Sequence, residues 1–254
     1  MFFVNLLEAN LKTRLIGTNI TYYTITKSTN DDIWEIWRNG GANGEVVVAD
    51  NQTHGRGQRS NKWISNPGQD ILCSFLLFEN LKKKSIGIYS ILIAIGITKG
   101  IQQLLSLDIQ LKWPNDLYIE NKKIGGILIE SKFKKNNLIL NIGFGINVNE
   151  SLDEFPEDII EYTTSLKAIY GYPIQRELLL ANILNAIDQL LQNIDPLQLA
   201  EEWNKRCFNI DQQISFNYKN QIRTGIFKKI NSRGQSIIEY NKEQIIFDGA
   251  IIQS

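Results

Sequence analysis

Apolar positions along the chain repeat with the period of a strand in some segments and with that of a helix in others. Residues 19–26, rich in β-branched and aromatic side chains, predict a strand, and residues 44–51 predict a buried strand. Further strands are expected over 71–78, 109–113, 116–120, 123–131 and 137–147.

Helical segments lie between and after these strands. Ser28 followed by Asp31 matches a helix start, with a hydroxyl at the cap and a carboxylate three residues later. Residues 86–97 are very apolar but form too short a run to span a bilayer, so they predict a buried helix, which should extend from residue 85 to about residue 105. Residues 176–194 predict an amphipathic helix, and a further helix is expected up to residue 206.

The pattern changes after residue 206. Over residues 212–254, short β-rich runs alternate with turn residues, which predicts a small all-β barrel. We therefore expect an α+β fold, with a mixed or antiparallel sheet and flanking helices in residues 1–205 and a small second domain in residues 206–254. Strict βαβ alternation is missing and no G-x-G-x-x-G motif opens a helix, which argues against a Rossmann domain.

Charge and composition narrow the classes of function. The 27 Lys and Arg balance the 27 Asp and Glu, so the chain lacks the basic excess of a non-specific nucleic-acid binder. The single histidine, His54, argues against His-rich zinc sites, and Cys73 and Cys207 are expected to be buried thiols. The N-terminal segment lacks the features of a signal peptide, so we expect a cytoplasmic protein without a membrane segment.

Residues 55–63, GRGQRSNKW, are basic and glycine-containing, and they suit neither a helix nor an alternating strand. Glycines let backbone N–H groups approach an anion closely. Arg56 adds a planar fork that suits a carboxylate or a phosphate. A solvated surface loop is the alternative interpretation of the same residues.

A second candidate segment is KWPND, residues 112–116. Pro114 favours extended geometry at Trp113, so Lys112 should end one strand and Asp116 should begin the next. Asp116 could hold a magnesium ion or orient a lysine. An ordinary Pro-Asn-Asp turn would explain the same sequence.

Two apolar strands contain glycines, which weaken a strand and often mark the close approach of a ligand. In the strand 123–131, Lys123 could reach an anion beside the paired glycines, whereas a β-bulge with an exposed lysine is the alternative. Asn147, which ends the next glycine-containing strand, could read an adenine edge or cap the strand end. Arg56, Lys112 and Lys123 thus suit a ligand with an apolar body and an anionic end, together with a nucleotide.

The segments GRGQRSNKW, KWPNDLYIENKKIGGILIE and GFGIN, in that order, resemble the catalytic domain of biotin–protein ligases. The family pattern is a GRGR-x-G-x-x-W loop, a KWPND turn and a K-x-x-G-I-L strand, and STN at 28–30 and Gln52 also match. The resemblance covers residues 20–205, and residues 207–254 resemble the SH3-like C-terminal domain of the family.

The resemblance implies a core similar to that of class II aminoacyl-tRNA synthetases and a ligase that works in two steps. ATP and Mg²⁺ would activate biotin as biotinyl-5′-AMP. A lysine of a biotin carboxyl carrier protein or domain would then take the biotin. The resemblance also leads us to expect a monomer or homodimer.

The motifs also imply site residues. Biotin contacts are expected from Ser28, Thr29, Asn30, Gln52, Gly55, Arg56, Gly57, Gln58, Trp63, Lys123 and Gly126. ATP contacts are expected from Arg56, Arg59, Lys112, Asn115, Lys123 and Asn147. Catalytic roles would fall to Arg56, Lys112, Asp116 and Lys123, with Asp116 as the magnesium ligand.

The chain also departs from the family pattern. Gln58 and Ser60 stand where the family often has arginine and glycine, and the loss of one cation could loosen retention of the adenylate. The segment before residue 19 is too short for the winged helix that some members carry, so we expect no DNA binding.

Two other functions stay open at this point. A lipoate- or octanoate-transferring relative shares the fold, although its Arg-Arg-x-x-Gly-Gly-Gly pattern is absent from this sequence. A non-catalytic biotin-binding protein is the second alternative, and Gln58 and Ser60 are the sequence features that favour it.

Overall fold

The structure is a computed structural model that describes residues 1–58, 61–80, 86–134, 137–218 and 221–247. The main sheet contains β1 (Ile20–Tyr23), β2 (Val46–Ala49), β3 (Ile71–Asn80), β4 (Gln110–Lys112), β5 (Asp116–Ile119), β6 (Lys122–Lys134) and β7 (Asn137–Ile146). The helices are α1 (Val4–Asn10), α2 (Thr29–Arg38), α3 (Ile86–Gln102), α4 (Leu166–Tyr170), α5 (Arg176–Gln192) and α6 (Pro196–Arg206), with a short 3₁₀ helix η2 (Leu152–Glu154).

The seven strands are ordered β1-β2-β3-β7-β6-β5-β4. β1 pairs with β2 in parallel, and every other neighbouring pair in this sheet is antiparallel. The sheet is therefore mixed, and the predicted α+β class is confirmed. The predicted strands also occur, although β1 and β2 are shorter at both ends than their sequence patterns suggest.

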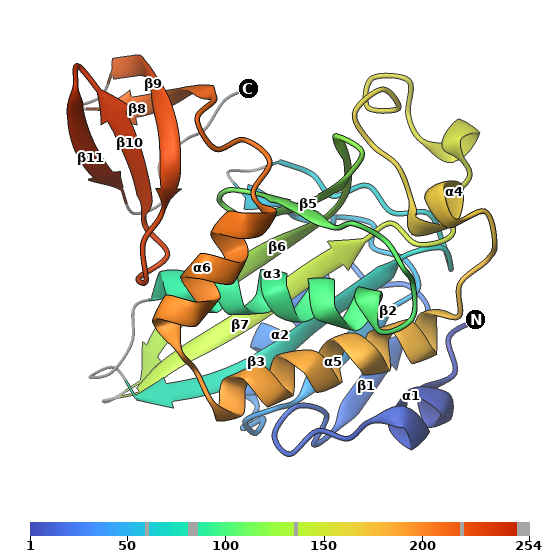
Figure 1. The fold of residues 1–254 in the computed structure, drawn as a ribbon. Helices are drawn as coiled ribbons and strands as arrows, with labels where there is room; N and C mark the ends of the chain where they lie inside the picture. Colours follow the sequence, from blue (N-terminus) through green and yellow to red (C-terminus); the bar gives the residue numbers. More distant parts are fainter. Residues whose placement is uncertain (59–60, 81–85, 135–136, 219–220, 248–254) are drawn as a thin grey trace.

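Helices cover both faces of this sheet (Figure 1). Val46 and Val48 of β2 lie in the large core that includes α3 and α5, whereas Val47 between them lies in a smaller core with Ile33 of α2. This alternation follows from the pleat of a strand, in which successive side chains point to opposite faces. The apolar helix α3 is buried along most of its length, as its sequence predicts.

The C-terminal segment forms a second antiparallel sheet from β8 (Gln213–Tyr218), β9 (Gln221–Ile230), β10 (Ser236–Tyr240) and β11 (Glu243–Phe247), in the order β11-β10-β9-β8. Phe227 of this sheet lies 6.5 Å, between ring centroids, from Trp203 of α6. The side-chain amide of Asn204 is hydrogen-bonded to both the N–H and the carbonyl of Ile230. A domain boundary at residue 206 stays a prediction, and apolar side chains from both sides of it share one core.

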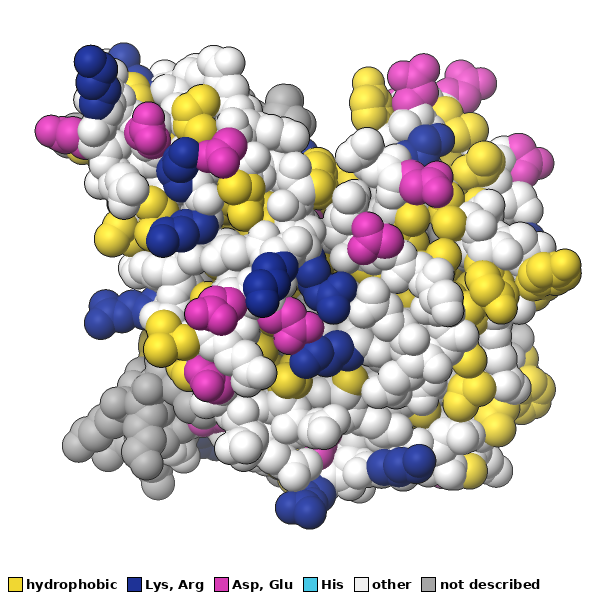
Figure 2. Space-filling view, viewed as in Figure 1, with side chains coloured by type: hydrophobic (Ala, Val, Ile, Leu, Met, Phe, Trp, Pro, Cys, Tyr) yellow, Lys and Arg dark blue, Asp and Glu magenta, His cyan; other side chains and the backbone are white. Residues whose placement is uncertain are grey.

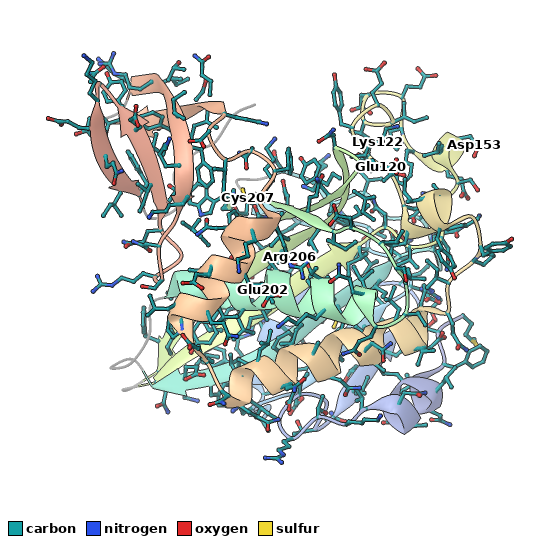
Figure 3. The ribbon with its side chains drawn as sticks, viewed as in Figure 1. Glu120, Lys122, Asp153, Glu202, Arg206 and Cys207 are labelled. Carbon is teal, nitrogen blue, oxygen red and sulfur yellow. The ribbon has the colours of Figure 1, made fainter. Side chains whose placement is uncertain are left out.

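Charged side chains of both signs are mixed over α6 and its surroundings, as expected for a chain with no net charge (Figure 2). On α6, Glu202 pairs with Lys99 of α3 at 3.0 Å and with Arg206 at 3.4 Å (Figure 3).

Cys73 and Cys207 are both buried and free, as predicted. Burial raises the pKa of the Cys207 thiol to about 11, so it is a thiol rather than a thiolate at neutral pH.

The sequence did not predict α1 or the way the N-terminal segment is held against α5. The buried carboxylate of Asp188, on α5, accepts hydrogen bonds from the backbone N–H groups of Arg14, Leu15 and Ile16 at 2.8–2.9 Å. Burial by itself would raise the pKa of Asp188. The hydrogen bonds outweigh burial and hold that pKa below its ordinary value.

Replacing Asp188 with alanine should lower the free energy of unfolding by about 2–3 kcal/mol at pH 7, because buried N–H donors lose their acceptor. Asp188 has a lower pKa in the folded than in the unfolded protein. Its contribution to the free energy of unfolding is therefore complete above the unfolded pKa of about 4. That contribution is lost as the pH falls through the pKa of the folded protein. Urea titrations at pH 7 and pH 3 measure the free energy of unfolding of wild type and variant, and the difference between the two proteins should be smaller at pH 3. The exposed Asp153→Ala control should change the free energy by less than about 0.5 kcal/mol.

Candidate functional site

The register of three central strands creates a face with small side chains. Gly143 of β7 pairs with Ser74 of β3 on one side and with Leu128 of β6 on the other. Gly145 of β7 pairs with Gly126 of β6. Directly opposed residues point to the same face of a sheet, so these residues form a shallow floor on the face that α2 covers farther along.

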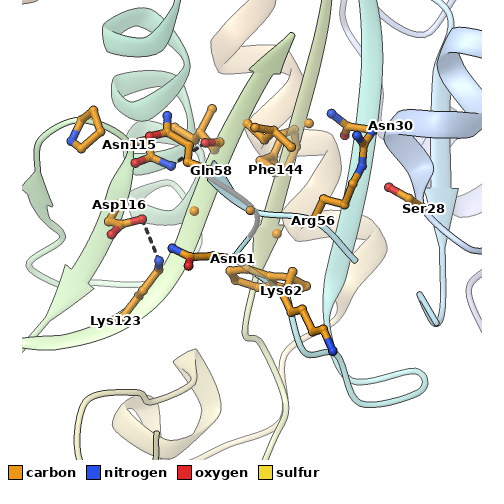
Figure 4. Close-up of a pocket in the computed structure, with 18 of the residues that line it drawn as sticks. Ser28, Asn30, Arg56, Gln58, Asn61, Lys62, Asn115, Asp116, Lys123 and Phe144 are labelled. Carbon is orange, nitrogen blue, oxygen red and sulfur yellow. Dashed lines mark hydrogen bonds and ion pairs between the residues drawn. The ribbon is translucent and has the colours of Figure 1, made fainter. Parts of the chain in front are cut away.

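A cavity of about 270 Å³ lies over this floor (Figure 4). Five segments line it: the start of α2, the loop residues 52–58 and 61–63, the turn between β4 and β5, strand β6, and strand β7. The predicted site residues among its lining are Ser28, Thr29, Asn30, Gln52, Arg56, Gly57, Gln58, Trp63, Lys112, Asn115, Asp116, Lys123 and Gly126. The structure thus brings together segments that are far apart in the sequence.

One end of the cavity is polar because the start of α2 faces the floor. Helix α2 begins at Thr29, but within the described chain the Ser28 side chain makes no cap hydrogen bond. Instead, the side-chain carbonyl of Gln52 accepts from Thr29 N at 2.7 Å and from Thr29 Oγ1 at 3.1 Å. The helix start predicted from Ser28 and Asp31 is confirmed, with Ser28 at the N-cap position and Asp31 in the first turn. The Asp31 carboxylate pairs with Arg56.

Asn30 connects this polar end to the floor. Its side-chain oxygen accepts from Ser74 Oγ at 2.7 Å, and its backbone carbonyl accepts from Asn141 Nδ2 at 2.8 Å. Asn30 is buried, and its side chain occupies the space that a Cβ at position 143 would need, 2.0 Å from its oxygen. Gly143 is thus required by the close approach of α2, independently of any ligand.

The basic loop folds back on itself at the mouth of the cavity. Trp63 N donates to the Gly55 carbonyl at 3.0 Å, and Gly57 N donates to the Asn61 carbonyl at 2.7 Å. The Trp63 indole lies over the glycine floor, where a Cβ at Gly145 would come within 2.5 Å of its ring. At Gly126 the nearest atoms would be 3.4 Å or more away, an ordinary contact.

The cations predicted from KWPND and KIGG lie at the other end of the cavity. Lys123 Nζ is 2.7 Å from Asp116 Oδ1 (Figure 4). The register between β5 and β6 shifts here, so Tyr118 pairs with Lys123 while Leu117 pairs with Gly125. The β-bulge that was the alternative explanation for this sequence is present, and the lysine beside it lines the cavity.

Lys112 lies in the same group, with Nζ 5.6 Å from the centroid of the Tyr118 ring. Burial lowers the pKa of Lys112, and the positive charge of Lys123 acts in the same direction. The carboxylate of Asp116 opposes both effects. Asn115 is fixed beside this group, because its side-chain amide donates to the Ile127 carbonyl at 2.6 Å.

Two of the predicted site residues that the structure describes lie outside this lining. Asn147 is buried outside the cavity lining, and its amide donates to the Thr164 carbonyl at 3.0 Å, so it joins β7 to the segment before α4. Gly55 lines an adjacent cavity on the other side of the loop. Arg59, like Ser60, lies outside the described residues.

Sequence reasoning missed several residues around the cavity, among them Asn61, Lys62, Leu128 and Phe144. Ser74 and Asn141 were also missed, although each is a buried polar residue within an apolar strand. That contrast was a usable signal, because buried polar side chains need a partner. Glu130 on β6, which pairs with Arg56, was also missed.

Within the described ranges, no group of three or more His, Cys, Asp or Glu side chains is arranged to hold a metal ion. Asp116 nevertheless provides one carboxylate in the cavity, and Mg²⁺ commonly binds through one or two carboxylates and the phosphates of a substrate. Among the described helices, none has the length and apolar character needed to cross a bilayer.

Comparisons with known proteins agree on one family. Residues 22–147 match the Biotin/lipoate A/B protein ligase family. The chain is 29% identical over 238 residues to the bifunctional ligase/repressor BirA of Bacillus subtilis, covering 91% of this chain and 73% of the relative. A variant of the Aquifex aeolicus biotin protein ligase in complex with biotin has a TM-score of 0.78 and 25% identity, covering 93% of this chain and 98% of that one. The same enzyme in complex with biotin and ATP also has a TM-score of 0.78, with 24% identity, and covers 93% and 99%.

The contacts of the two floor glycines predict different costs of adding a methyl group. Gly145→Ala should lower the free energy of unfolding by about 1–3 kcal/mol through overpacking against Trp63, whereas Gly126→Ala should change it by less than about 1 kcal/mol. Urea titration measures both. In a Trp63→Ala background the cost of Gly145→Ala should disappear, and a cost that persists there would contradict the assigned contact.

Proposed function

Because the chain belongs to the biotin/lipoate A/B protein ligase family, we propose that it is a biotin–protein ligase. In this proposal the enzyme activates biotin with ATP as biotinyl-5′-AMP and transfers biotin to a lysine of a biotin carboxyl carrier protein. The observation that carries the proposal is the shape of the cavity, which has a polar end at α2, a glycine floor and a cationic end at Lys112 and Lys123. An acyl chain with a polar head and a carboxylate tail fits this order of surfaces.

The polar end suits the head group of the substrate. Ser28, Thr29, Asn30 and Gln52 supply hydroxyl and amide groups that can both donate and accept hydrogen bonds. Their backbone and side-chain contacts fix them before a ligand arrives, which reduces the ordering cost of binding. The small floor residues leave room for the ring system and chain above the sheet.

The cationic end suits the first chemical step. A carboxylate oxygen must attack the α-phosphorus of ATP, and pyrophosphate leaves, so two anionic groups approach each other. Lys112 and Lys123 at this end, together with Arg56 from the loop beside α2, provide positive charge that reduces this repulsion and stabilises the charge that develops in the transition state. The carboxylate is already ionised at neutral pH, so this step needs no general base.

Mg²⁺ would be held by Asp116 and the nucleotide phosphates, and it would neutralise charge on those phosphates. In the second step the amine of the carrier lysine attacks the carbonyl carbon of the mixed anhydride, and AMP leaves. Asp116 lies beside Lys123 and provides a carboxylate that can orient the attacking lysine. Gln58 and Gly57 line the same cavity, near the expected position of the adenylate.

We further propose that the mixed sheet is a core of the class II aminoacyl-tRNA synthetase type and that β8–β11 form an SH3-like domain. The separate antiparallel sheet of β8–β11, which follows the end of α6, supports this division at residue 206. In this view the smaller domain helps to dock the nucleotide or the carrier. We expect a cytoplasmic monomer or homodimer that binds neither DNA nor membranes.

Incubation with biotin, ATP, Mg²⁺ and a purified biotin carboxyl carrier domain tests the proposed function. We expect release of pyrophosphate and a carrier mass that increases by one biotinyl group. Lipoate and octanoate in parallel reactions distinguish an acyl-transferring relative. Biotin binding without pyrophosphate release would instead indicate a non-catalytic binding protein.

Lys123→Gln keeps most of the side-chain length and removes the charge. We expect the maximal rate of pyrophosphate release to fall by about 10²-fold, as for loss of a transition-state donor, while biotin affinity changes much less. A biotin titration of initial rates measures both quantities. The matched control is Lys122→Gln, one residue earlier and outside the cavity lining, which should leave the curve unchanged. An unchanged curve for Lys123→Gln would remove Lys123 from the mechanism.

The lowered pKa of Lys112 predicts a pH dependence. Its charged form stabilises the transition state, so activity should be lost as the pH rises through that pKa, at a lower pH than for an ordinary lysine. Lys112→Arg stays charged to higher pH, so the alkaline fall in kcat/KM should move upward even where the absolute rate decreases. Measurement of kcat/KM from pH 7 to 10.5 for the wild type and for Lys112→Arg tests this. An alkaline fall at the same pH in both proteins would contradict the prediction.

A further inference from the structure

Glu130 on β6 receives contacts from three other parts of the chain. Its Oε2 atom accepts from Trp34 Nε1 of α2 at 2.8 Å and from Asn141 Nδ2 of β7 at 3.3 Å. Asn30 Nδ2, at the polar end of the cavity, lies 3.4 Å from the same oxygen. These donors fix the carboxylate in one position beside the cavity.

The same carboxylate holds Arg56 of the basic loop. Arg56 Nη1 lies 3.2 Å from Oε1 of Glu130, and Nη2 lies 3.3 Å from Oε2, which is the two-point geometry that suits a guanidinium. Arg56 Nη2 also lies 2.8 Å from Oδ1 of Asp31. Both Nη2 contacts are hydrogen bonds, and the Nη1 contact is an ion pair, so two carboxylates hold one end of the guanidinium.

The two carboxylates differ in how firmly they are held. The Asp31 side chain is 58% exposed, and exposed ion pairs generally contribute little. The Glu130 side chain is 28% exposed and is fixed by the Trp34 indole. Glu130 is therefore the fixed partner, and Asp31 is the weaker second contact.

We propose that Glu130 is a positioning residue that holds Arg56 at the cavity mouth, ready to retain the acyl-adenylate. The inference rests on the proposed function, since Arg56 is the loop cation expected to contact the adenylate. A free arginine side chain loses rotamer freedom when it binds an anion, whereas an arginine already held in place loses less. Glu130 contributes through Arg56 and does not itself touch the reacting atoms.

The arrangement also joins Arg56 to the polar end of the cavity. Asn30 donates to Glu130 with its amide group and accepts from Ser74 with its oxygen. A head group bound at the polar end would therefore affect, through Asn30, the same carboxylate that orients Arg56. Hydrogen-bonded groups that share an acceptor act as a unit, so single substitutions within them are not additive.

A double-mutant cycle tests the inference. The variants are Glu130→Gln, Arg56→Ala and the two combined, with Glu35→Gln as the control, an exposed glutamate of α2. Glu130→Gln keeps an acceptor for Trp34 and removes the charge. The measurement is the rate at which preformed, labelled biotinyl-5′-AMP leaves each protein in a chase with unlabelled biotin and ATP, together with the affinity for biotin.

We expect Glu130→Gln to speed adenylate release by about tenfold, the loss of one charge-assisted contact, with a much smaller change in biotin affinity. In the Arg56→Ala background the same substitution should add nothing, and Glu35→Gln should match the wild type. An equal effect of Glu130→Gln with and without Arg56 would show that Glu130 acts through the packing of Trp34 and β6, which overturns the inference. No effect in either background also overturns it.

A ligand-free measurement separates this inference from the proposed function. Cleavage after Arg56 by an arginine-specific protease should be about threefold faster in Glu130→Gln than in the wild type or in Glu35→Gln, because the loop loses its anchor. Asp31→Asn, which alters an exposed side chain, should give a smaller increase in a fully folded protein. Equal cleavage of all four proteins would show that the carboxylates do not hold Arg56. A wild type that forms no adenylate would contradict the ligase assignment alone.

Discussion

The pairing register of β3, β7 and β6 is the constraint on which both the core and the cavity depend. On one face of β7, Leu140, Ile142, Phe144 and Ile146 enter the large core. The alternate positions, Gly143 and Gly145, form the cavity floor. A slip of one residue would exchange the two sets, filling the cavity with apolar side chains and leaving glycines in the core. The stability of the core therefore enforces the shape of the cavity.

Charge balance is the second constraint on this site. Arg56 is matched by Glu130 and Asp31, and Lys123 is matched by Asp116. Partly buried cations without such partners would carry a desolvation cost, so the carboxylates let these cations take their positions before an anionic ligand is present. A carboxylate or phosphate that enters the cavity then meets donors that are already oriented, which is the condition for electrostatic stabilisation of a transition state.

Local pattern predicted the elements of this fold well, because alternation and apolar runs depend on neighbouring residues. It predicted the buried helix α3 and the long strands β6 and β7. It predicted that α2 starts after Ser28, but it gave no sign that the side-chain carbonyl of Gln52, far from Ser28 in the sequence, accepts from Thr29 N. It also gave no sign that Asp188 holds the backbone of Arg14–Ile16, since a contact across more than 170 residues leaves no periodic trace.

In the candidate site, too, local features were predicted from the sequence, whereas contacts between distant residues were not. Motifs predicted the lysines and glycines that line the cavity, because spacing within one loop or strand is visible in the sequence. Asn147 seemed equally suitable, but its amide is used by the carbonyl of Thr164. Glu130 was overlooked because its partners, Trp34 and Arg56, become neighbours only when α2 and the basic loop pack on β6.

Trp113 connects the C-terminal sheet to the turn that lines the cavity. Trp113 lies between Lys112 and the cis peptide bond to Pro114, in the turn that also carries Asp116. Its indole Nε1 donates to the Gly234 carbonyl at 3.3 Å, and its ring lies 6.4 Å from that of Phe227, between centroids. The turn that places the cations is thus packed against the second sheet. The contacts of Trp113 tie the position of Lys112 to the docking of β8–β11. The smaller sheet therefore contributes to the site, although none of its described residues lines the cavity.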